Sequence, residues 1–326
     1  MKRRYVTADV FTDVKFGGNP LAVVLDAEGL STREMQAIAL EFNYSETTFV
    51  LPPHDPTHTA KVRIFTPRTE VPFAGHPNVG TAFVLARETP FAAAATLSAG
   101  GTFVFEETAG LVPLKLLHEH GTTVGAELRA PEVLSRRSVV SRETAAACLS
   151  LDPQDIAMHV HAPQVVSVGL PFVAVELGSR DALRRSKPNI AAHADLLPLD
   201  GADAIFAYWR DPEPSLKSGE TILHARTFAP LDGVIEDPAT GSASAAAIAL
   251  LTSLQSEPRA EQVWRIHQGV DMGRPSLLLG RTVSRDGRGV GDAGGVGGVG
   301  SVGFAPPLET HIGGRCVAVF EGTLIL

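Results

Sequence analysis

The chain has 326 residues, a formal charge of −8 at pH 7, an isoelectric point near 5.8 and two cysteines. This length suffices for two ordinary domains, and the acidic balance argues against nucleic acid or a membrane surface as a partner. The N-terminal stretch lacks the apolar run of a secretory signal, and two cysteines cannot form a disulfide framework, so we expect a cytoplasmic protein.

The first half of the chain is predicted to consist of strands and two helices. Ser31 and Glu34 form the signature of a capping box, and apolar residues follow at helical spacing, which predicts a helix over 32–42. Glu46 then lies at the junction with the next strand. The segment 72–86 predicts a helix of small and apolar residues. Strands are expected at 5–11, 21–25, 47–51, 60–66, 102–106, 111–117 and 123–129.

The second half has a similar pattern after a link at 131–140. Short helices are expected over 142–149 and 181–188. The run from Gly287 to Gly303 contains mainly Gly, Val and Ser, so we interpret 284–309 as a flexible insertion. Its GxGxxG-like spacings lack the flanking strand and helix of a dinucleotide site. Strands are expected at 164–168, 172–177, 204–209, 222–228, 263–268, 276–279, 316–320 and 323–326.

A second helix of small residues is expected in the uncharged run 239–255. A helix that is apolar all round belongs in a core or a membrane, and the serines and threonines in this run favour a core. The free N–H groups of Gly241, Ser242 and Ala243 would form a site for a carboxylate or phosphate at the helix N-terminus.

Three motifs occur twice in the same order. GNPLAVV at 18–24 is similar to GLPFVAV at 169–175, and RIFTP at 63–67 to RTFAP at 226–230. Pro72 and Gly75 likewise match Pro238 and Gly241. Ordered repeats indicate a duplicated unit, so we expect two similar domains that face each other across a cleft. The expected boundaries are 1–130, completed by the last strands at about 315–326, and 131–314.

Three titratable residues, Glu46, His76 and Asp237, are expected at this cleft. His76 and Asp237 lie on the loops that lead into the two central helices, where an anion would bind. Such groups beside a carboxylate suit proton transfer. Each also has a plain structural explanation: a surface acid, a histidine bonded to backbone, and an acid favoured by a helix dipole.

The segments GGNPLAVV, NYSETTFV, RIFTPRTEVPFAGHPNVGTA, EDPATGSASAA and QGVDMGRPS together resemble the phenazine-biosynthesis isomerase (PhzF-like) family of the diaminopimelate epimerase superfamily. The resemblance implies an α+β fold of two pseudo-symmetric domains, each a curved, mostly antiparallel sheet around a central helix. It also implies a possible homodimer and a cleft that binds a small carboxylate-bearing substrate. The insertion at 284–309 departs from the family pattern.

Carried over by this resemblance, Glu46 is the proton-shuttling carboxylate, and His76 and Asp237 are the other polar active-site residues. The resemblance also assigns positions that hold the substrate and its carboxylate, namely Ser45, Gly75, Gly241 and Ser242.

The superfamily's racemases use one thiol at the start of each central helix, and this chain has none there. Cys148 and Cys316 are expected to be buried structural residues. We therefore expect an isomerase that needs no cofactor and in which Glu46 alone removes and returns a proton. Two alternatives stay open: an epimerase that uses Glu46 and Asp237 as two bases, and a binding protein that keeps the fold without catalysis.

No metal site is expected. His118 and His120, and likewise His159 and His161, form pairs without a third ligand at a recognisable spacing. Arg274 is interpreted either as a contact to an acidic substrate or as part of a structural salt bridge.

Overall fold

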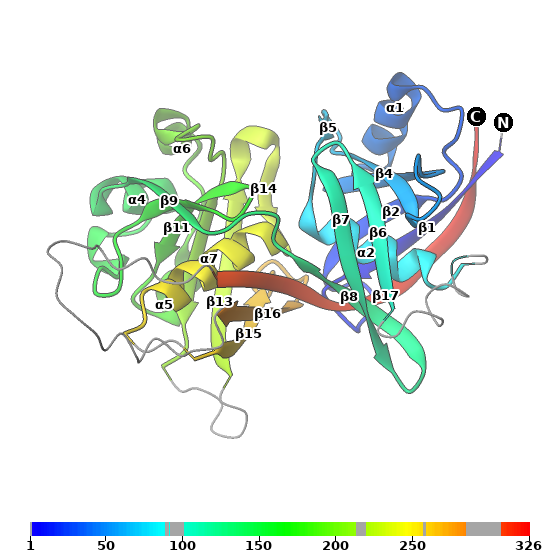
Figure 1. Ribbon diagram of the computed structural model, residues 1–326. Helices are drawn as coiled ribbons and strands as arrows, with labels where there is room; N and C mark the ends of the chain where they lie inside the picture. Colours follow the sequence, from blue (N-terminus) through cyan, green and yellow to red (C-terminus); the bar gives the residue numbers. More distant parts are fainter. Residues whose placement is uncertain (1, 89–90, 92–100, 213–219, 257–258, 285–307) are drawn as a thin grey trace, which may run out of the picture.

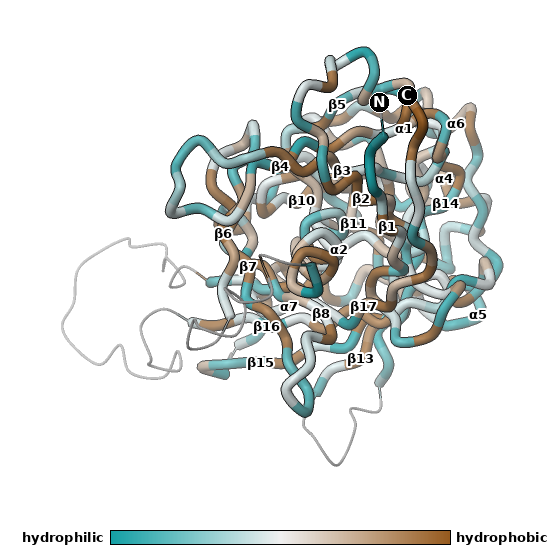
Figure 2. The backbone as a smooth tube through the Cα atoms, turned by 90° about the vertical axis from the view of Figure 1, so that its right-hand side faces the viewer, coloured by the Kyte–Doolittle hydropathy of each residue, from teal (hydrophilic) through white to brown (hydrophobic). Residues whose placement is uncertain are grey.

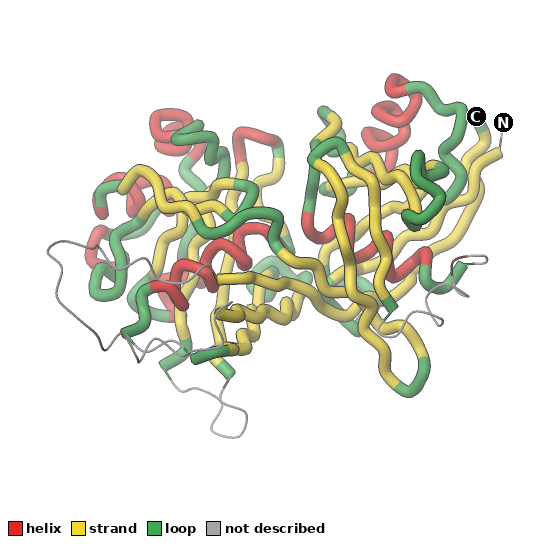
Figure 3. Tube along the Cα trace, in the orientation of Figure 1, coloured by secondary structure: helices red, strands yellow, loops and turns green. Residues whose placement is uncertain are grey.

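The structure, a computed structural model, describes residues 2–88, 91, 101–212, 220–256, 259–284 and 308–326. Its strands form one mixed sheet that spans two lobes, and the described part contains few helices. In Figures 1 and 3 the first lobe lies on the right and the second on the left. The strands of the first lobe are β1 (Lys2–Val10), β2 (Asn19–Val24), β3 (Glu46–Leu51), β4 (Ala60–Phe65), β5 (Glu70–Val71), β6 (Thr102–Glu107), β7 (Gly110–Glu119) and β8 (Thr122–Arg129).

The second lobe follows with β9 (Ser135–Val139), β10 (Gln164–Ser167), β11 (Pro171–Glu176), β12 (Ile205–Arg210), β13 (Thr221–Ala229), β14 (Val234–Asp237), β15 (Glu261–Gln268), β16 (Ser276–Ser284) and β17 (Leu308–Ile325). The helices are α1 (Thr32–Phe42), α2 (Gly75–Leu85), α4 (Arg142–Leu149), α5 (Arg180–Arg185), α6 (Ile190–Leu196) and α7 (Gly241–Ser253). The predicted capping box of Ser31 and Glu34 is present at the start of α1.

Two helices, α2 and α7, form the centre of the molecule. Every residue of α2 is buried, and α7 is buried along nearly its whole length. Figure 2 shows the brown, hydrophobic turns of α2 surrounded by strands. Small residues make this possible, because strands can approach the helix backbone from several sides. Apolar residues of both helices belong to one continuous hydrophobic cluster.

Within the described residues, the chain crosses between the lobes twice. β8 pairs with β7 and β17, and the strand that follows it, β9, pairs with β10 of the second lobe. In return, the first part of β17 pairs with β16 and its last part runs antiparallel to β1. These crossings tie the lobes together through backbone hydrogen bonds.

Several predictions about elements were wrong in detail. The predicted link at 131–140 contains β9, and the two predicted C-terminal strands are one long strand, β17. The strand predicted at 276–279 continues to Ser284, whose successors 285–307 lie outside the described residues, as does most of the predicted insertion. The short elements α6, β5 and β14 were not predicted, because each is too short to show a clear period.

Candidate active site

The structure brings Glu46, His76 and Asp237 together at the junction of the lobes. Glu46 is the first residue of β3, His76 the second of α2, and Asp237 the last of β14 before α7. Glu46 Oε2 lies 3.5 Å from His76 Nε2. Asn19, at the start of β2, places its Nδ2 2.9 Å from Asp237 Oδ1 and 3.3 Å from His76 Nδ1.

Sequence reasoning missed Asn19, which is fully buried. Its Nδ2 donates to Asp237 Oδ1 and also to Ala239 O, at 3.0 Å. A signal was available, because the repeated motif has Asn19 in its first copy and Leu170 in its second. A polar residue in only one copy of a buried motif points to a role beyond packing.

Asp237 is surrounded by hydrogen-bond donors. Besides Asn19, the hydroxyl of Thr240 donates to its Oδ2, and the hydroxyl of Ser45 lies 3.5 Å from its Oδ1. Burial raises the pKa of Asp237 to about 6, and these hydrogen bonds oppose the rise. The donors therefore favour the ionised form and fix its orientation.

Glu46 and His76 have the most strongly shifted pKa values of the cluster. Burial, followed by the charge of Asp237, raises the pKa of Glu46 to about 8. Burial lowers the pKa of His76 to about 3, so its imidazole is neutral. Glu46 Oε2 and His76 Nε2 are buried and have no hydrogen-bond partner among the described residues. A polar or acidic group of a substrate can form the missing hydrogen bonds to both atoms.

The two central helices begin next to each other. A Cβ on Gly75 would lie 3.5 Å from Ser242 N and 3.7 Å from the Cα of Gly241. Neither helix start is capped by a side chain, since Ala74 has none to offer and the Thr240 hydroxyl donates to Asp237 instead. Uncapped N–H groups at two helix N-termini favour an anion.

The cysteines lie elsewhere, as predicted. Cys148 is in α4 and Cys316 in β17, and both are buried. Burial raises the pKa of the Cys148 thiol to about 11 and that of the Cys316 thiol to about 12. Neither thiol is therefore ionised near neutral pH.

Arg274 belongs to a structural network between the lobes. Its guanidinium donates to Asp9 Oδ1 at 2.7 Å, Gly17 O at 2.7 Å and Gly18 O at 2.9 Å. These groups flank the loop that leads to Asn19. Of the two interpretations of Arg274, the structure shows the salt bridge, with Asp9 almost fully buried.

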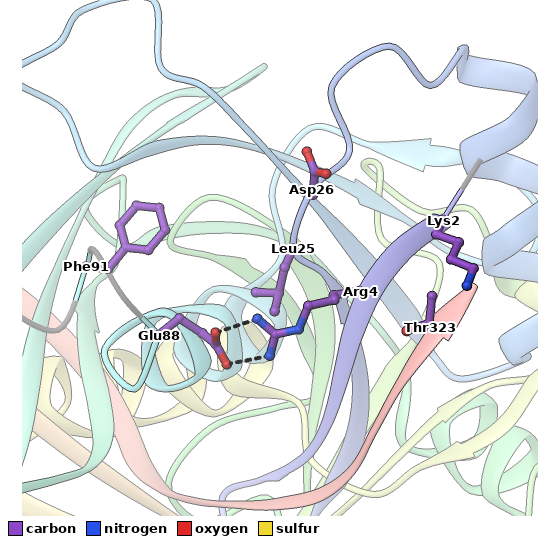
Figure 4. Close-up of a pocket in the computed structure, with 7 residues that line it drawn as sticks. All are labelled: Lys2, Arg4, Leu25, Asp26, Glu88, Phe91 and Thr323. Atoms are coloured by element: carbon purple, nitrogen blue, oxygen red, sulfur yellow. Dashed lines mark hydrogen bonds and ion pairs between the residues drawn. The ribbon is translucent and has the colours of Figure 1, made fainter. Parts of the chain in front are cut away.

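The described residues line, among others, two hollows. A small one is next to the helix starts and is mostly apolar; it is lined by Phe73, Gly75, Leu128, Ala130, Pro131, Val168, Leu170, Ser242, Ala245 and Ile312. The other is an open groove close to the chain ends, shown in Figure 4. There Arg4 makes a two-point ion pair with Glu88, so its charge is already balanced.

Within the described ranges, no group of three or more His, Cys, Asp or Glu residues could hold a metal ion. His161 instead bonds to Tyr208 and to the carbonyl of Ala162. None of the helices in the described part is long and apolar enough to cross a membrane.

Comparison with known proteins assigns the chain to a family. The family described as phenazine biosynthesis-like protein (PhzC-PhzF) matches residues 8–290. This chain belongs to that family. An uncharacterized isomerase of Mesorhizobium japonicum is 39% identical over 99% of both chains. A trans-2,3-dihydro-3-hydroxyanthranilate isomerase of Pseudomonas aeruginosa is 35% identical over 85% of this chain and 90% of its own.

Solved structures share the fold. A PhzF-family protein of Bacillus anthracis covers all of both chains with a TM-score of 0.81 at 24% identity. A predicted epimerase of Pseudomonas aeruginosa covers 99% of both chains with a TM-score of 0.73 at 28% identity. A hydroxyproline epimerase of Agrobacterium vitis has a TM-score of 0.57 at 12% identity. The family and its named relatives identify the chain as an isomerase with a fold shared by PhzF proteins and proline racemase-like enzymes.

Proposed function

We propose that this chain is a PhzF-like isomerase that moves a proton within a small carboxylate-bearing metabolite, with Glu46 as its single acid and base and without a cofactor. The observation that carries the proposal is the pair of buried, unpartnered atoms, Glu46 Oε2 and His76 Nε2, 3.5 Å apart. A carboxyl with a pKa of about 8 is a strong base for an acid side chain, yet close enough to neutrality to be ionised in part.

In this mechanism the substrate carboxylate lies at the N–H groups of Gly75, Gly241 and Ser242. Ionised Glu46 takes a proton from one carbon, and the resulting negative charge spreads into the substrate's conjugated system. Protonated Glu46 then returns the proton to another carbon on the same face. Neutral His76 lies beside the transfer path and can bond to a polar group of the substrate.

The arrangement of donors gives Asp237 a positioning role. Its two oxygens receive hydrogen bonds from Asn19 and Thr240, with the Ser45 hydroxyl 3.5 Å away, and these donors lower its pKa and so weaken it as a base. This favours a single base over the alternative in which Glu46 and Asp237 act from opposite faces.

The strand pairings support two domains of similar topology. In the first lobe β1–β2 and β3–β4 are antiparallel, whereas β2–β3 and β4–β6 are parallel. In the second lobe β10–β11 and β12–β13 are antiparallel, whereas β11–β12 and β13–β15 are parallel. We propose pseudo-symmetric domains at 1–130, completed by the end of β17, and 131–314.

The second lobe lacks the polar groups of the first at the corresponding positions. In the aligned motifs, Leu170 is equivalent to Asn19, and Phe172 is equivalent to Leu21. Leu21 pairs with Glu46 at the start of β3, and the corresponding residue before β12 is Ala204. A second base related by the pseudo-symmetry is therefore missing, which supports catalysis by one carboxyl.

Trans-2,3-dihydro-3-hydroxyanthranilate, named for three relatives, is our proposed test substrate. It should be deuterated at the carbon that loses its proton and converted in ordinary water. A single base predicts that part of the deuterium reappears at the carbon that gains the proton. Turnover with complete loss of the label to solvent would contradict direct transfer by Glu46. Binding without turnover would favour the non-catalytic alternative.

The homodimer and the cytoplasmic location remain predictions. Light scattering coupled to size-exclusion chromatography tests the first: a mass near twice the 34.4 kDa of the chain is expected.

A further inference from the structure

Glu107 is a carboxyl that the proposed mechanism does not use. It is the last residue of β6, in which Phe103 and Phe105 are buried in the core around α2. Because side chains alternate along a strand, Glu107 lies on the same inward face. Glu107 thus ends an apolar row of inward-facing side chains, Phe103 and Phe105, that packs toward α2, the helix that contains His76.

The groups around Glu107 fit a neutral carboxyl. Both of its oxygens are buried and lack a hydrogen-bond partner among the described residues, as does Oδ1 of fully buried Asn78 in α2. Asn78 Nδ2 donates to Ala74 O at 3.0 Å, which fixes the orientation of the amide. An ionised Glu107 would be a buried charge without a cation, which is costly.

A protonated Glu107 would give all of these unpartnered atoms a hydrogen bond. Its O–H can donate to Asn78 Oδ1, and the Asn78 amide can donate to its other oxygen. The direction of the pKa agrees with a neutral carboxyl: burial raises the pKa of Glu107 to about 8, and the nearby Asn78 side chain is the opposing influence.

Charged groups on the neighbouring elements are engaged elsewhere. On β6, Glu106 points outward and accepts from the backbone of His54 and Asp55. On β4, Lys61 contacts His54 and Arg63 binds Glu70. On β7, Lys115 is exposed, His118 lies outside the apolar row, and Glu119 binds Arg315. On α2, His76 faces Glu46.

The second lobe shows what this position does. Lys61 pairs with Glu106 as His224 pairs with His267, so the next residues, Glu107 and Gln268, correspond. Buried Gln268 donates to Asp237 O at 2.9 Å and accepts from Thr240 N at 3.1 Å. An amide at this strand position therefore holds the start of α7.

We propose that Glu107 is a positioning residue: in its neutral form it pairs with Asn78 and fixes the first turns of α2, and so the imidazole of His76. This role rests on the proposed function insofar as it concerns turnover. The neutral pair itself is a property of the fold and can be tested without a substrate.

The first test compares thermal unfolding of wild type and Glu107→Gln between pH 5 and 9. The unfolded chain ionises Glu107 near its ordinary pKa of 4.5, whereas the folded chain ionises it at about 8. Ionisation of Glu107 therefore lowers the stability of wild type as pH rises from 4.5 to 8, and Glu107→Gln lacks this contribution while it keeps that of Glu46. We expect the Tm of Glu107→Gln to gain about 3 °C or more on wild type across this range.

Glu34→Gln is the control, because Glu34 is an exposed acid that bonds to Ser31 and has no histidine among its partners. Hydrogen bonds from Ser31 lower the pKa of Glu34, so its variant should differ from wild type by a constant amount above pH 5. A Tm difference for Glu107→Gln that stays constant between pH 5 and 9 would overturn the neutral pair.

The second test measures His76 directly. The ¹⁵N chemical shifts of its ring, which report tautomer and hydrogen bonding, should change in Glu107→Leu and stay as in wild type in Glu107→Gln at pH 7. If wild type converts the test substrate, kcat should fall about ten- to a hundredfold in Glu107→Leu and be restored in Glu107→Gln. Unchanged His76 shifts in Glu107→Leu would refute the positioning role. Absence of turnover in wild type would contradict the proposed function and leave the unfolding and NMR results to decide this inference.

Discussion

In the first lobe, Asn19 begins β2 and Glu46 begins β3, whereas the corresponding positions of the second lobe hold Leu170 and Ala204. The two lobes share their strand pairings and each encloses one buried helix. They differ at these two positions, where the first lobe has the polar residues Asn19 and Glu46 and the second has the apolar residues Leu170 and Ala204. One copy of a repeated unit can thus carry the proton chemistry while the other supplies Asp237, N–H groups and apolar walls.

The substitution with the largest expected effect is Glu46→Gln, which removes the proposed base. The amide has the same shape but cannot accept a proton, so we expect kcat to fall by about 10²- to 10⁴-fold. The measurement is the rate of conversion of the dihydro-hydroxyanthranilate at pH 8. Glu41→Gln, which changes an exposed acid of α1, is the control and should retain full activity.

Glu46→Gln also tests how much the buried Glu46 carboxyl lowers the stability of the fold. Because burial raises the pKa of Glu46 to about 8, ionisation of the unfolded chain near pH 4.5 lowers the stability of wild type as pH rises from 4.5 to 8. Glu46→Gln should therefore have the higher Tm at pH 8 and equal wild type near pH 4. A variant that is less stable than wild type at pH 8 would contradict the pKa shift.

Arg274→Met tests how the two lobes are joined. The substitution leaves Asp9 buried without its cation and frees the carbonyls of Gly17 and Gly18, so unfolding should become easier by about 3 kcal/mol. Denaturant unfolding gives this value. Arg184→Met removes an exposed pair with Asp181 and should change stability by less than about 1 kcal/mol. Equal effects of the two substitutions would show that the Arg274 network contributes no more to stability than an exposed ion pair.

Asn19→Leu copies the residue of the second lobe into the first. Asp237 then loses its donor at 2.9 Å, and its pKa should rise because that hydrogen bond favours the ionised form. We expect an effect of about 1–3 kcal/mol on turnover, which is the cost of leaving such a group unpaired. Asn19→Ser retains a small donor and should lose less. Identical kcat in all three proteins would exclude a role for Asn19.

Much of this fold could be predicted from the sequence because its signals are local. The capping box at Ser31, the strand patterns and the two uncharged helical runs are all readable within short windows. β17 was divided in two because Gly322 interrupts its pattern, and its first part was missed where Gly313 and Gly314 do the same. The structure needs glycine at these positions to let Tyr5, Glu127 and Phe11 come close.

The site was only partly predictable, because its chemistry depends on contacts between distant residues. Glu46, His76 and Asp237 were found through motifs at the starts of elements, and the structure does bring them together. Asn19 and Glu107 were missed, since neither shows its burial or its partners in a local pattern. Arg274 could not be assigned until its contacts with the loop before Asn19 were known.

The pH dependence of kcat/KM tests whether Glu46 of the first lobe or Asp237 of the second is the base, and it has the smallest expected effects. Glu46 must be ionised to accept a proton, so kcat/KM should rise through its pKa of about 8 and level off above it. Between pH 6 and 8 this rise is about tenfold per pH unit.

Below pH 6 the slope should steepen, because protonation of Asp237, with its pKa of about 6, disrupts the donor network around it. Asn19→Leu should shift only this lower break, to higher pH. Glu107→Gln should leave both breaks in place, since it touches neither titrating carboxyl. A single break near pH 6, with full activity by pH 7, would instead assign the base to Asp237, and the proton chemistry would then belong to the second lobe.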